Sequence, residues 1–282
     1  MKKIFSLLLA LGMCLAISVS AFAAFDDVAS NAWYAEGVAA CYDYGIVTGT
    51  SETTFSPDRA ITRGEFVTML FRMHIAADYK GHLRIEEYIG FRSNLLGMLP
   101  SADALLELTT EFYYEMGTRF SDVDIDAYYS SAVSWAVEYG YATGTSETSF
   151  APNEPITREQ MMAMLYRYEL RRGVSAAYQG ESEQFVSRVA ETFGFDTFGK
   201  EVIVNTSTCD GFSDGYLVSS YAREGVSWAL QPGYVTGVSN TMIDPNGIAT
   251  RAQVVTIFER MLSDVELGLI SHYLRNNPAI DY

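Results

Sequence analysis

The sequence predicts a mainly α-helical protein built from three helix-loop-helix repeats, and two observations carry this prediction. A Thr-Arg pair opens an apolar helical run three times. Each pair also follows a glycine and a proline at fixed distances, eight residues from Gly to Pro and five from Pro to Thr. The pairs are Thr62-Arg63, Thr157-Arg158 and Thr250-Arg251, and the glycines are Gly49, Gly144 and Gly237. An internal repeat of this kind indicates copies that pack on one another, because one helix pair cannot bury its own apolar face.

Each copy is expected to begin with a first helix, near residues 33–44, 128–139 and 221–231. Small and aromatic residues alternate there with polar residues at helical spacing. A glycine follows each of these helices and fits the position after the last helical residue, where a left-handed backbone is common. These glycines are Gly45, Gly140 and Gly233.

A loop of Gly, Ser, Thr and one Pro then leads to the second helix, which we expect to begin at the threonine of each Thr-Arg pair. Apolar residues recur along this second helix at helical spacing. They are Phe66, Met69, Leu70 and Met73 in copy one, Met161, Met164, Leu165 and Tyr168 in copy two, and Val254, Ile257, Phe258 and Met261 in copy three. These stripes, or those of the first helices, are expected to meet around a shared axis.

The first 24 residues match the pattern of a secretory signal peptide. Lys2 and Lys3 precede an apolar stretch, and Ala21-Phe22-Ala23 is the small-x-small pattern that signal peptidase cuts. A membrane anchor is the alternative, but the apolar run is shorter than the ~20 residues that a spanning helix needs. We therefore expect an exported chain with no membrane contact after cleavage.

The repeats divide the remainder of the chain into blocks. Copies one, two and three are predicted at residues 25–74, 120–169 and 212–262. Inserts at 75–119 and 170–211 separate the copies, and a tail follows at 263–282. Both inserts carry amphipathic patterns, so we expect packed helical additions in place of flexible linkers.

The composition excludes several classes of partner and site. The formal net charge is −16, which argues against nucleic acid or anionic lipid as a general partner. The three histidines have no metal-ligand spacing, and no cofactor motif is present, so neither a metal nor a cofactor is expected. Cys41 is expected in a buried helix, with a disulfide to Cys209 as the less favoured alternative.

Each Thr-Arg pair lies in a capping box. A Thr at the N-cap accepts from the amide three residues on, and Glu or Gln at that position returns a bond to the Thr amide. The predicted pairs are Thr62 with Glu65, Thr157 with Gln160, and Thr250 with Gln253.

Capping does not explain the arginine, because a cation at the first helical position opposes the helix dipole. A guanidinium beside free helix-end amides can hold a carboxylate or a phosphate. The alternative is a structural ion pair with an aspartate of the same copy. The arginines are Arg63, Arg158 and Arg251, and the aspartates are Asp27, Asp122 and Asp214.

Three aromatic residues, Trp33, Tyr128 and Tyr221, occupy matching positions at the start of the first helices. A flat ring near a Gly-rich loop is a sugar-stacking platform or a core residue, and the sequence leaves both interpretations open. Trp135 and Trp228 lie well inside their helices, so we expect them in the core.

Taken together, these motifs resemble the S-layer homology domain in three copies. The marks are Phe-x-Asp-Val, an aromatic eight residues on, Gly-x-Val-x-Gly, Phe-x-Pro and Ile-Thr-Arg-x-Glu. The resemblance implies a pseudo-threefold, three-pronged helical module that binds pyruvylated secondary cell-wall polysaccharide in grooves between prongs. It implies that Arg63, Arg158 and Arg251 hold the pyruvate carboxylate, and that the glycines Gly49, Gly144 and Gly237 let the backbone approach the sugar. Trp33, Tyr128 and Tyr221 would line the groove, and we add Asp27, Asp122 and Asp214 as candidate ligand-binding residues.

The chain departs from the family pattern in its long inserts and in copy three. Copy three has Gly215 in place of the Val, one extra residue, and Pro232 at a helix end. Its groove is therefore the one that the resemblance supports least.

The predicted function is a non-catalytic, exported protein of a bacterial cell wall or surface layer. Its partner would be cell-wall polysaccharide, and its inserts would be available to other surface proteins. One alternative is a surface-layer assembly component that has lost sugar binding. Another is an enzyme acting on wall glycans, whose first candidate carboxylates are Glu86, Glu87, Glu181 and Glu183.

Overall fold

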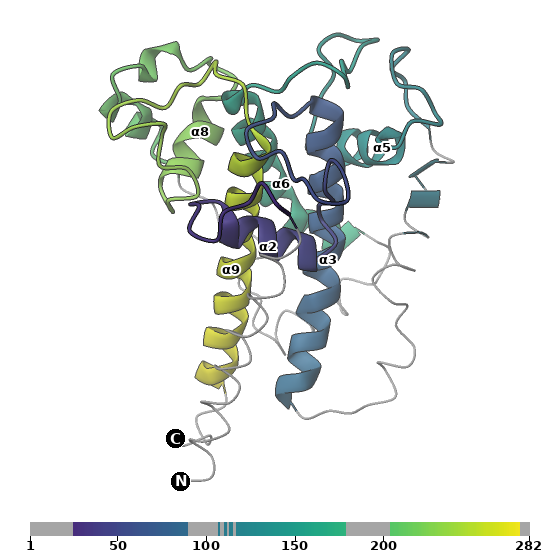
Figure 1. Ribbon diagram of the computed structural model, residues 1–282, viewed down its shortest axis with the longest axis vertical. Coiled ribbons are helices and arrows are strands. Elements are labelled where there is room, and N and C mark those ends of the chain that lie inside the picture. The colour runs from purple at the N-terminus through teal and green to yellow at the C-terminus, as the bar shows by residue number, and fades with distance from the viewer. Residues whose placement is uncertain are drawn as a thin grey trace.

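The computed structural model of the chain describes residues 25–89, 107, 110–111, 113–114, 117–178 and 204–276. The predicted signal peptide, about half of the first insert and most of the second insert lie outside the described residues. Within the described part, the chain is helical (Figure 1). No helix there has both the length and the apolar character needed to cross a membrane.

Each copy contributes a short first helix and a long second helix. The first helices are α2 (Ala35–Asp43), α5 (Ser130–Glu138) and α8 (Arg223–Leu230). The second helices are α3 (Arg63–Ile89), α6 (Arg158–Tyr178) and α9 (Arg251–Asn276). Copy three also has two 3-10 helices, η1 (Thr206–Gly211) and η2 (Gly215–Leu217).

The helix ends differ from the predicted ends in two ways. The first helices begin two residues later than expected, so the aromatic positions at 33, 128 and 221 precede them. The second helices run past residues 74, 169 and 262, which were expected to end the copies. The stop glycines behave as predicted, because Gly45, Gly140 and Gly233 have positive φ values of 68°, 66° and 80°.

The copies interlock, because each first helix packs on the second helix of the preceding copy. Helix α5 of copy two packs on α3 of copy one, and α8 of copy three packs on α6 of copy two. Helix α2 of copy one packs on α9 of copy three, which closes the series into a ring (Figure 1). The second helices α3 and α9 also contact each other, and the rings of Phe66 and Phe258 lie 6.1 Å apart.

A small residue lets the first helix approach closely. A Cβ atom added at Gly37 of α2 would lie 2.9 Å from backbone atoms of Val255 and Thr256 on α9. A Cβ added at Gly225 of α8 would lie 2.7 Å from Ala163 of α6. The interlocking of copies therefore depends on glycine at these two contacts.

Three backbone hydrogen bonds close a ring at the pseudo-threefold axis. Ile61 donates to Ala249, Ala249 donates to Ile156, and Ile156 donates to Ile61, each at 3.0 Å. All three side chains are fully buried. The copies therefore meet around a shared axis, but through the residues just before the second helices; of the predicted second-helix stripes, the structure brings those of α3 and α9 into contact.

Candidate functional site

Each second helix begins with the predicted capping box. The Glu65 amide donates to Thr62 Oγ1 at 3.2 Å, and the Thr62 amide donates to Glu65 Oε2 at 3.0 Å. The equivalent pairs, at 3.2–3.4 Å, are Thr157 with Gln160 and Thr250 with Gln253. The change from Glu to Gln keeps the cap, because the amide oxygen accepts the same bond.

The three motif arginines are buried, and each reaches the loop of the next copy around the ring. Their Nε–H groups donate at 2.9 Å to backbone carbonyl oxygens. The pairs are Arg63 with Phe150, Arg158 with Ile243, and Arg251 with Phe55. Arg63 and Arg251 also lie over the rings of these phenylalanines, 4.8 and 4.4 Å from the centroids. Each arginine thus holds two copies together.

Burial lowers the pKa of all three arginines below the ordinary arginine value. The guanidinium groups still stay charged at neutral pH, because arginine is not deprotonated in proteins. Hydrogen bonds from a charged donor to a carbonyl are stronger than neutral ones, so these contacts are strong links between copies.

The alternative of an Arg–Asp ion pair within one copy is wrong in the described residues. Asp27 instead accepts hydrogen bonds from the amides of Phe55 and Ser56, at 2.8 and 2.7 Å. The equivalent contacts join Asp122 to Phe150 and Ala151, and Asp214 to Ile243 and Asp244. The aspartate therefore fixes the loop whose carbonyl group the arginine of another copy binds.

The same carboxylates stabilise an unfavourable backbone conformation. Ser56, Ala151 and Asp244 have φ values between 54° and 58°, which are uncommon for residues other than glycine. Burial acts to raise the pKa of Asp122. Hydrogen bonds from the Ser149 hydroxyl and from two backbone amides outweigh burial, so the pKa lies below the usual aspartate value.

The loop glycines are required by the loops themselves. A Cβ atom at Gly49 would lie 2.2 Å from the Ser51 carbonyl oxygen and 2.6 Å from the Phe25 ring, and Gly144 has equivalent neighbours. Gly237 of copy three differs, because its φ is +90°. Packing of the loop explains these glycines, and their role in approach to a sugar remains a prediction.

The three matched aromatic side chains are exposed to solvent. The exposed fractions are 64% for Trp33, 66% for Tyr128 and 52% for Tyr221. The interpretation of these three as core residues is therefore wrong. Trp135 and Trp228, in contrast, are buried as expected.

Residues from all three copies meet around Glu159. Its carboxylate accepts hydrogen bonds from the Ser219 amide at 2.9 Å, the Ser219 hydroxyl at 2.8 Å and the Tyr221 hydroxyl at 3.0 Å. Burial and the bond to Glu159 raise the pKa of Tyr221 to about 12, against the opposing charges of Arg167 and Arg63. Arg63 of copy one, Glu159 of copy two and Tyr221 of copy three thus share one region.

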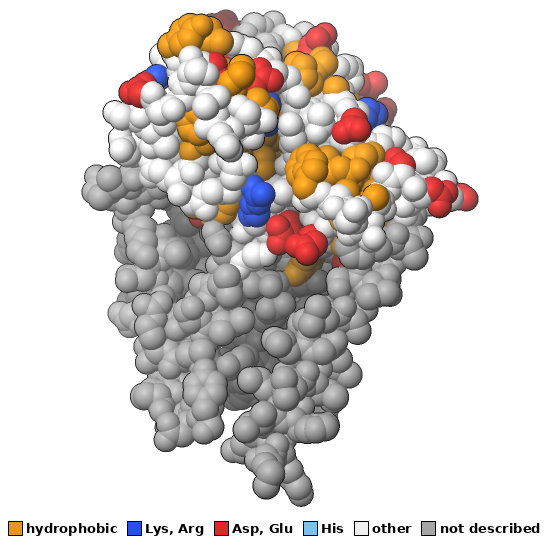
Figure 2. Space-filling view, turned by 60° about the vertical axis from the view of Figure 1, so that its left-hand side comes forward, with side chains coloured by type: hydrophobic (Ala, Val, Ile, Leu, Met, Phe, Trp, Pro, Cys, Tyr) orange, Lys and Arg blue, Asp and Glu red, His pale blue; other side chains and the backbone are white. Residues whose placement is uncertain are grey.

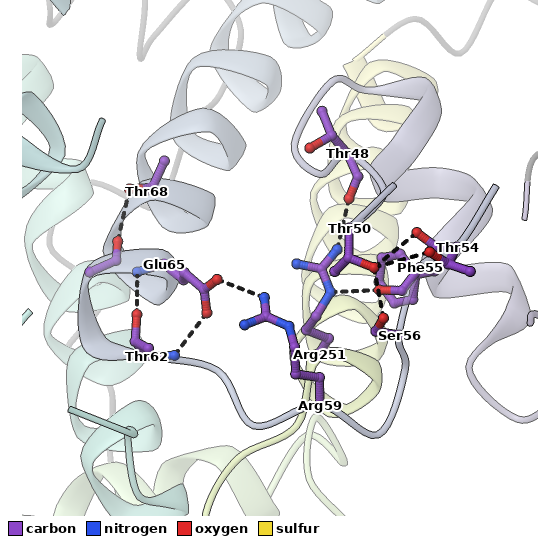
Figure 3. Close-up of polar contacts among 11 residues, drawn as sticks. Thr48, Thr50, Thr54, Phe55, Ser56, Arg59, Thr62, Glu65, Thr68 and Arg251 are labelled. Carbon is purple, nitrogen blue, oxygen red and sulfur yellow. Dashed lines mark hydrogen bonds and ion pairs between the residues drawn. The ribbon is translucent and has the colours of Figure 1, made fainter. Parts of the chain in front are cut away.

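We name three junction sites after the copy whose loop the motif arginine contacts. The copy-one site consists of Arg251 and loop 48–59, the copy-two site of Arg63 and loop 143–154, and the copy-three site of Arg158 and loop 236–247. Figure 3 shows the copy-one site, with Arg251 beside Phe55 and Thr48.

Glu159 places a buried carboxylate between the copy-two and copy-three sites, because its amide donates to the Pro245 carbonyl and its carboxylate binds Tyr221, on which the charge of Arg63 acts. Glu159 is buried, whereas copy one has Gly64 at the matching position. A Cβ added at Gly64 would lie 3.0 Å from the Tyr129 ring. Copy three has Ala222 at the position of Tyr129, which leaves room for the longer Glu159 side chain.

In the copy-three site, one guanidinium group has an unpaired nitrogen. Nη2 of Arg63 donates to the Thr143 carbonyl at 3.0 Å, and Nη2 of Arg251 donates to the Thr48 carbonyl at 2.7 Å. Nη2 of Arg158 is buried and has no hydrogen-bond partner among the residues that the structure describes. The loop of this copy also has the glycine with positive φ, so its backbone follows a different path.

Sequence reasoning missed two charged residues at these sites, Arg59 and Glu159. Neither belongs to the repeated motif. Arg59 follows the loop proline by two residues, where copies two and three have Glu154 and Gly247. A comparison of the copies position by position would have found both as changes of charge.

Other predicted features have clear places. Cys41 and Cys209 are buried and free, so the disulfide alternative is wrong. Glu86 and Glu87 lie on α3 where only the backbone is described, and residues 181 and 183 lie outside the described part. Among the described residues, no three His, Cys, Asp or Glu side chains gather as metal ligands would.

The surface carries hydrophobic side chains outside the core. Figure 2 shows one face on which such side chains form separate patches, with acidic and basic groups beside them. Apart from the three matched aromatics, the more exposed examples include Tyr216, Val238 and Leu217.

Comparison with known proteins gives a family for the repeated blocks. The family described as "S-layer homology domain" matches residues 24–67, 119–162 and 211–255.

Several characterised proteins are similar to this chain. An endoglucanase of Bacillus sp. (strain KSM-635) is 31% identical over 68% of the chain and 16% of the relative. An amylopullulanase of Thermoanaerobacterium thermosulfurigenes is 26% identical over 84% of the chain and 9% of the relative. A surface-layer 125 kDa protein of Lysinibacillus sphaericus is 23% identical over 89% of the chain and 16% of the relative. The chain thus covers only a small part of each relative.

Proposed function

Because the chain carries three S-layer homology domains, we propose that it is a non-catalytic protein that attaches to the cell wall at a bacterial surface. Its ligand would be secondary cell-wall polysaccharide that bears pyruvate carboxylates, held at the junction sites. Three linked sites on one rigid ring would increase the overall affinity for a repeating polymer.

One observation supports this proposal most directly. Each copy exposes an aromatic ring just before its first helix, although the other large aromatic side chains of the repeats are mostly buried. Trp33, Tyr128 and Tyr221 occupy matching positions, and more than half of each residue stays exposed although Tyr221 also donates to Glu159. Exposed rings beside hydroxyl-rich loops suit stacking against the faces of sugar rings.

Co-sedimentation with purified bacterial cell walls tests the proposal. The walls are used before and after mild acid treatment, which removes pyruvate ketals. We expect the protein to pellet with untreated walls only. The double variant Trp33→Ala/Tyr128→Ala should weaken binding about tenfold, because each loses a stacking surface.

Tyr216→Ala is the matched control, because Tyr216 is 79% exposed on η2 and lies outside the three matched positions. It should bind as the unchanged protein does. Equal binding to acid-treated walls, or normal binding by the double variant, would refute carbohydrate recognition at these rings.

A second candidate function is assembly into a surface layer without sugar binding. The motif arginines favour it, because each is buried and bound to a backbone carbonyl of another copy. The wall experiment separates the two functions, since a purely structural module would not distinguish intact from acid-treated walls. The inserts would then be the surfaces offered to other proteins.

A further inference from the structure

The positive charge that a ligand can reach differs among the three junction sites. In the copy-one site, the Arg251 guanidinium is buried, and Nε and Nη2 are bonded to the carbonyls of Phe55 and Thr48. A group held in this way presents only a narrow edge to solvent. An anion at this site therefore needs a second, more accessible cation for a strong contact.

Arg59 supplies such a cation. Its side chain is 40% exposed, and its Nη2 donates to Glu65 Oε1 at 2.6 Å (Figure 3). Its backbone carbonyl accepts the Arg251 amide at 3.1 Å, so the loop places Arg59 directly beside the motif arginine. The charge of Arg59 also contributes, after burial, to the lowered pKa of Arg251.

The ion pair with Glu65 positions the Arg59 side chain but uses only part of its hydrogen-bonding capacity. The other carboxylate oxygen of Glu65 accepts the Thr62 amide in the capping box, so this carboxylate is anchored to the helix end. Only one nitrogen of Arg59 is used by the ion pair. A guanidinium has five N–H donors, so the others remain available to a bound carboxylate.

The surroundings of Arg59 suit a sugar. Hydroxyl groups of Thr50, Thr54 and Ser56 form a connected cluster on the same loop, with 2.7 Å between Thr50 Oγ1 and Ser56 Oγ. Tyr128 lies at the same helix end: burial and then the charge of Glu65 raise the pKa of its hydroxyl, while a hydrogen bond with the Thr62 side chain and, more weakly, the charge of Arg59 lower it. The site thus combines a cation, hydroxyl groups and an aromatic ring.

The other two sites have no arginine at the position of Arg59, although the charge of Arg167 acts on Arg63 and Tyr221 at the copy-two site. At that position they have Glu154 and Gly247, and the Glu159 carboxylate binds Tyr221 beside the copy-two site. The loop of copy three exposes apolar Val238 and Met242. An acidic ligand would therefore meet repulsion at the copy-two site and a more apolar rim at the copy-three site.

We propose that Arg59 is the anion-contacting arginine of the copy-one site, and that this site binds acidic saccharides more tightly than the other two. Arg59 extends toward the carboxylate of the sugar while Arg251 keeps the loop in place. The inference rests on the proposed function, because it assumes that the ligand is an acidic glycan.

Nuclear magnetic resonance can test each site separately in the full chain. The Nε–H groups of Arg63, Arg158 and Arg251 are buried and hydrogen-bonded, so each gives a reporter signal for its own site. The probe is a methyl glycoside of pyruvylated N-acetylmannosamine. The control ligand is the methyl ester of the same pyruvate group, which has a similar shape but lacks the negative charge of the carboxylate.

We expect the acid, and not the ester, to shift the Arg251 signal at the lowest concentration of the three. Arg59→Gln should raise the half-saturating concentration for this signal about fivefold, and Arg59→Lys should restore most of the affinity. Arg223→Gln is the control, because Arg223 also forms an exposed ion pair, with Asp210, on another part of the ring.

The outcomes separate the two proposals. Unchanged binding of the acid by Arg59→Gln overturns the role of Arg59 and leaves wall binding intact. A first shift at the Arg63 or Arg158 signal overturns the ranking of the sites. If the unchanged protein binds neither this probe nor cell walls, the proposed function fails together with the inference.

Discussion

At the scale of single residues, each motif arginine both begins a helix and links two copies. Each lies at the first position of a helix and donates to a carbonyl group far away in the chain. The carbonyl belongs to a residue whose amide is fixed by the aspartate of that loop. The arginine thus binds the carbonyl group, and the aspartate binds the amide group, of the same loop residue.

The unequal hydrogen bonding of these arginines predicts unequal costs of removal. Arg251→Ala leaves the carbonyls of Phe55 and Thr48 without their donor, whereas Arg158→Ala leaves only Ile243. We expect Arg251→Ala to lower the free energy of unfolding by about 3 kcal/mol and Arg158→Ala by about 2 kcal/mol. Urea denaturation of both variants at one pH measures the difference. Equal losses would mean that the second hydrogen bond contributes nothing.

Residue-scale prediction from the sequence succeeded where the partners are close in the chain. The capping boxes join residues three apart, so their spacing alone defines them. The partner carbonyl of Arg63 lies 87 residues away in the sequence, and that of Arg251 lies 196 residues away. Every residue has a backbone carbonyl, so the residue type does not identify the partner. The role of each arginine in joining copies therefore needed the structure.

At the scale of helices, the short first helices depend on close contact more than on apolar bulk. Helix α2 faces α9 through Gly37, and α8 faces α6 through Gly225. Such contacts bring backbones together and leave no room for even one methyl group. A glycine inside a helix lowers helix propensity by about 1 kcal/mol relative to alanine, so its presence here requires a packing reason.

Gly37→Ala tests this packing. The added Cβ would lie 2.9 Å from backbone atoms of α9, so the helix must shift. We expect a net loss of stability of about 2 kcal/mol despite the better helix propensity of alanine. Gly211→Ala, where no neighbouring atom lies within 4 Å, is the matched control and should change the thermal midpoint little. A more stable Gly37→Ala variant would show that the α2–α9 contact is loose.

The helices themselves were predictable, but their pairing was not. Apolar spacing and stop glycines located both helices of every copy. The same spacing is compatible with a first helix packed on its own second helix or on that of the preceding copy. Only side-chain shape, such as the fit of Gly37 against Val255, distinguishes these arrangements.

At the scale of the whole molecule, the copies form one closed unit. The ring of backbone bonds among Ile61, Ala249 and Ile156 uses one residue from each copy. Every copy therefore contacts both others, and none has a complete core alone. A linear array of repeats would instead have two free ends.

Closure predicts that the ring unfolds as one cooperative unit. Ile257 lies on α9 and is buried, so Ile257→Val should destabilise the ring by about 1 kcal/mol. We expect hydrogen exchange of amides in α5, which belongs to copy two and packs on α3, to accelerate by the same free energy. An effect limited to α9 and α2 would show that the copies open independently.

The α2–α9 contact also sets the order in which the fold can be completed. Helix α2 is among the first parts of the ring to be synthesised, and its partner α9 is the last. The first helix of copy one therefore stays uncovered until α9 of copy three is available. Contacts of such long sequence separation slow folding. The ring accordingly stays open during synthesis until α9 has emerged.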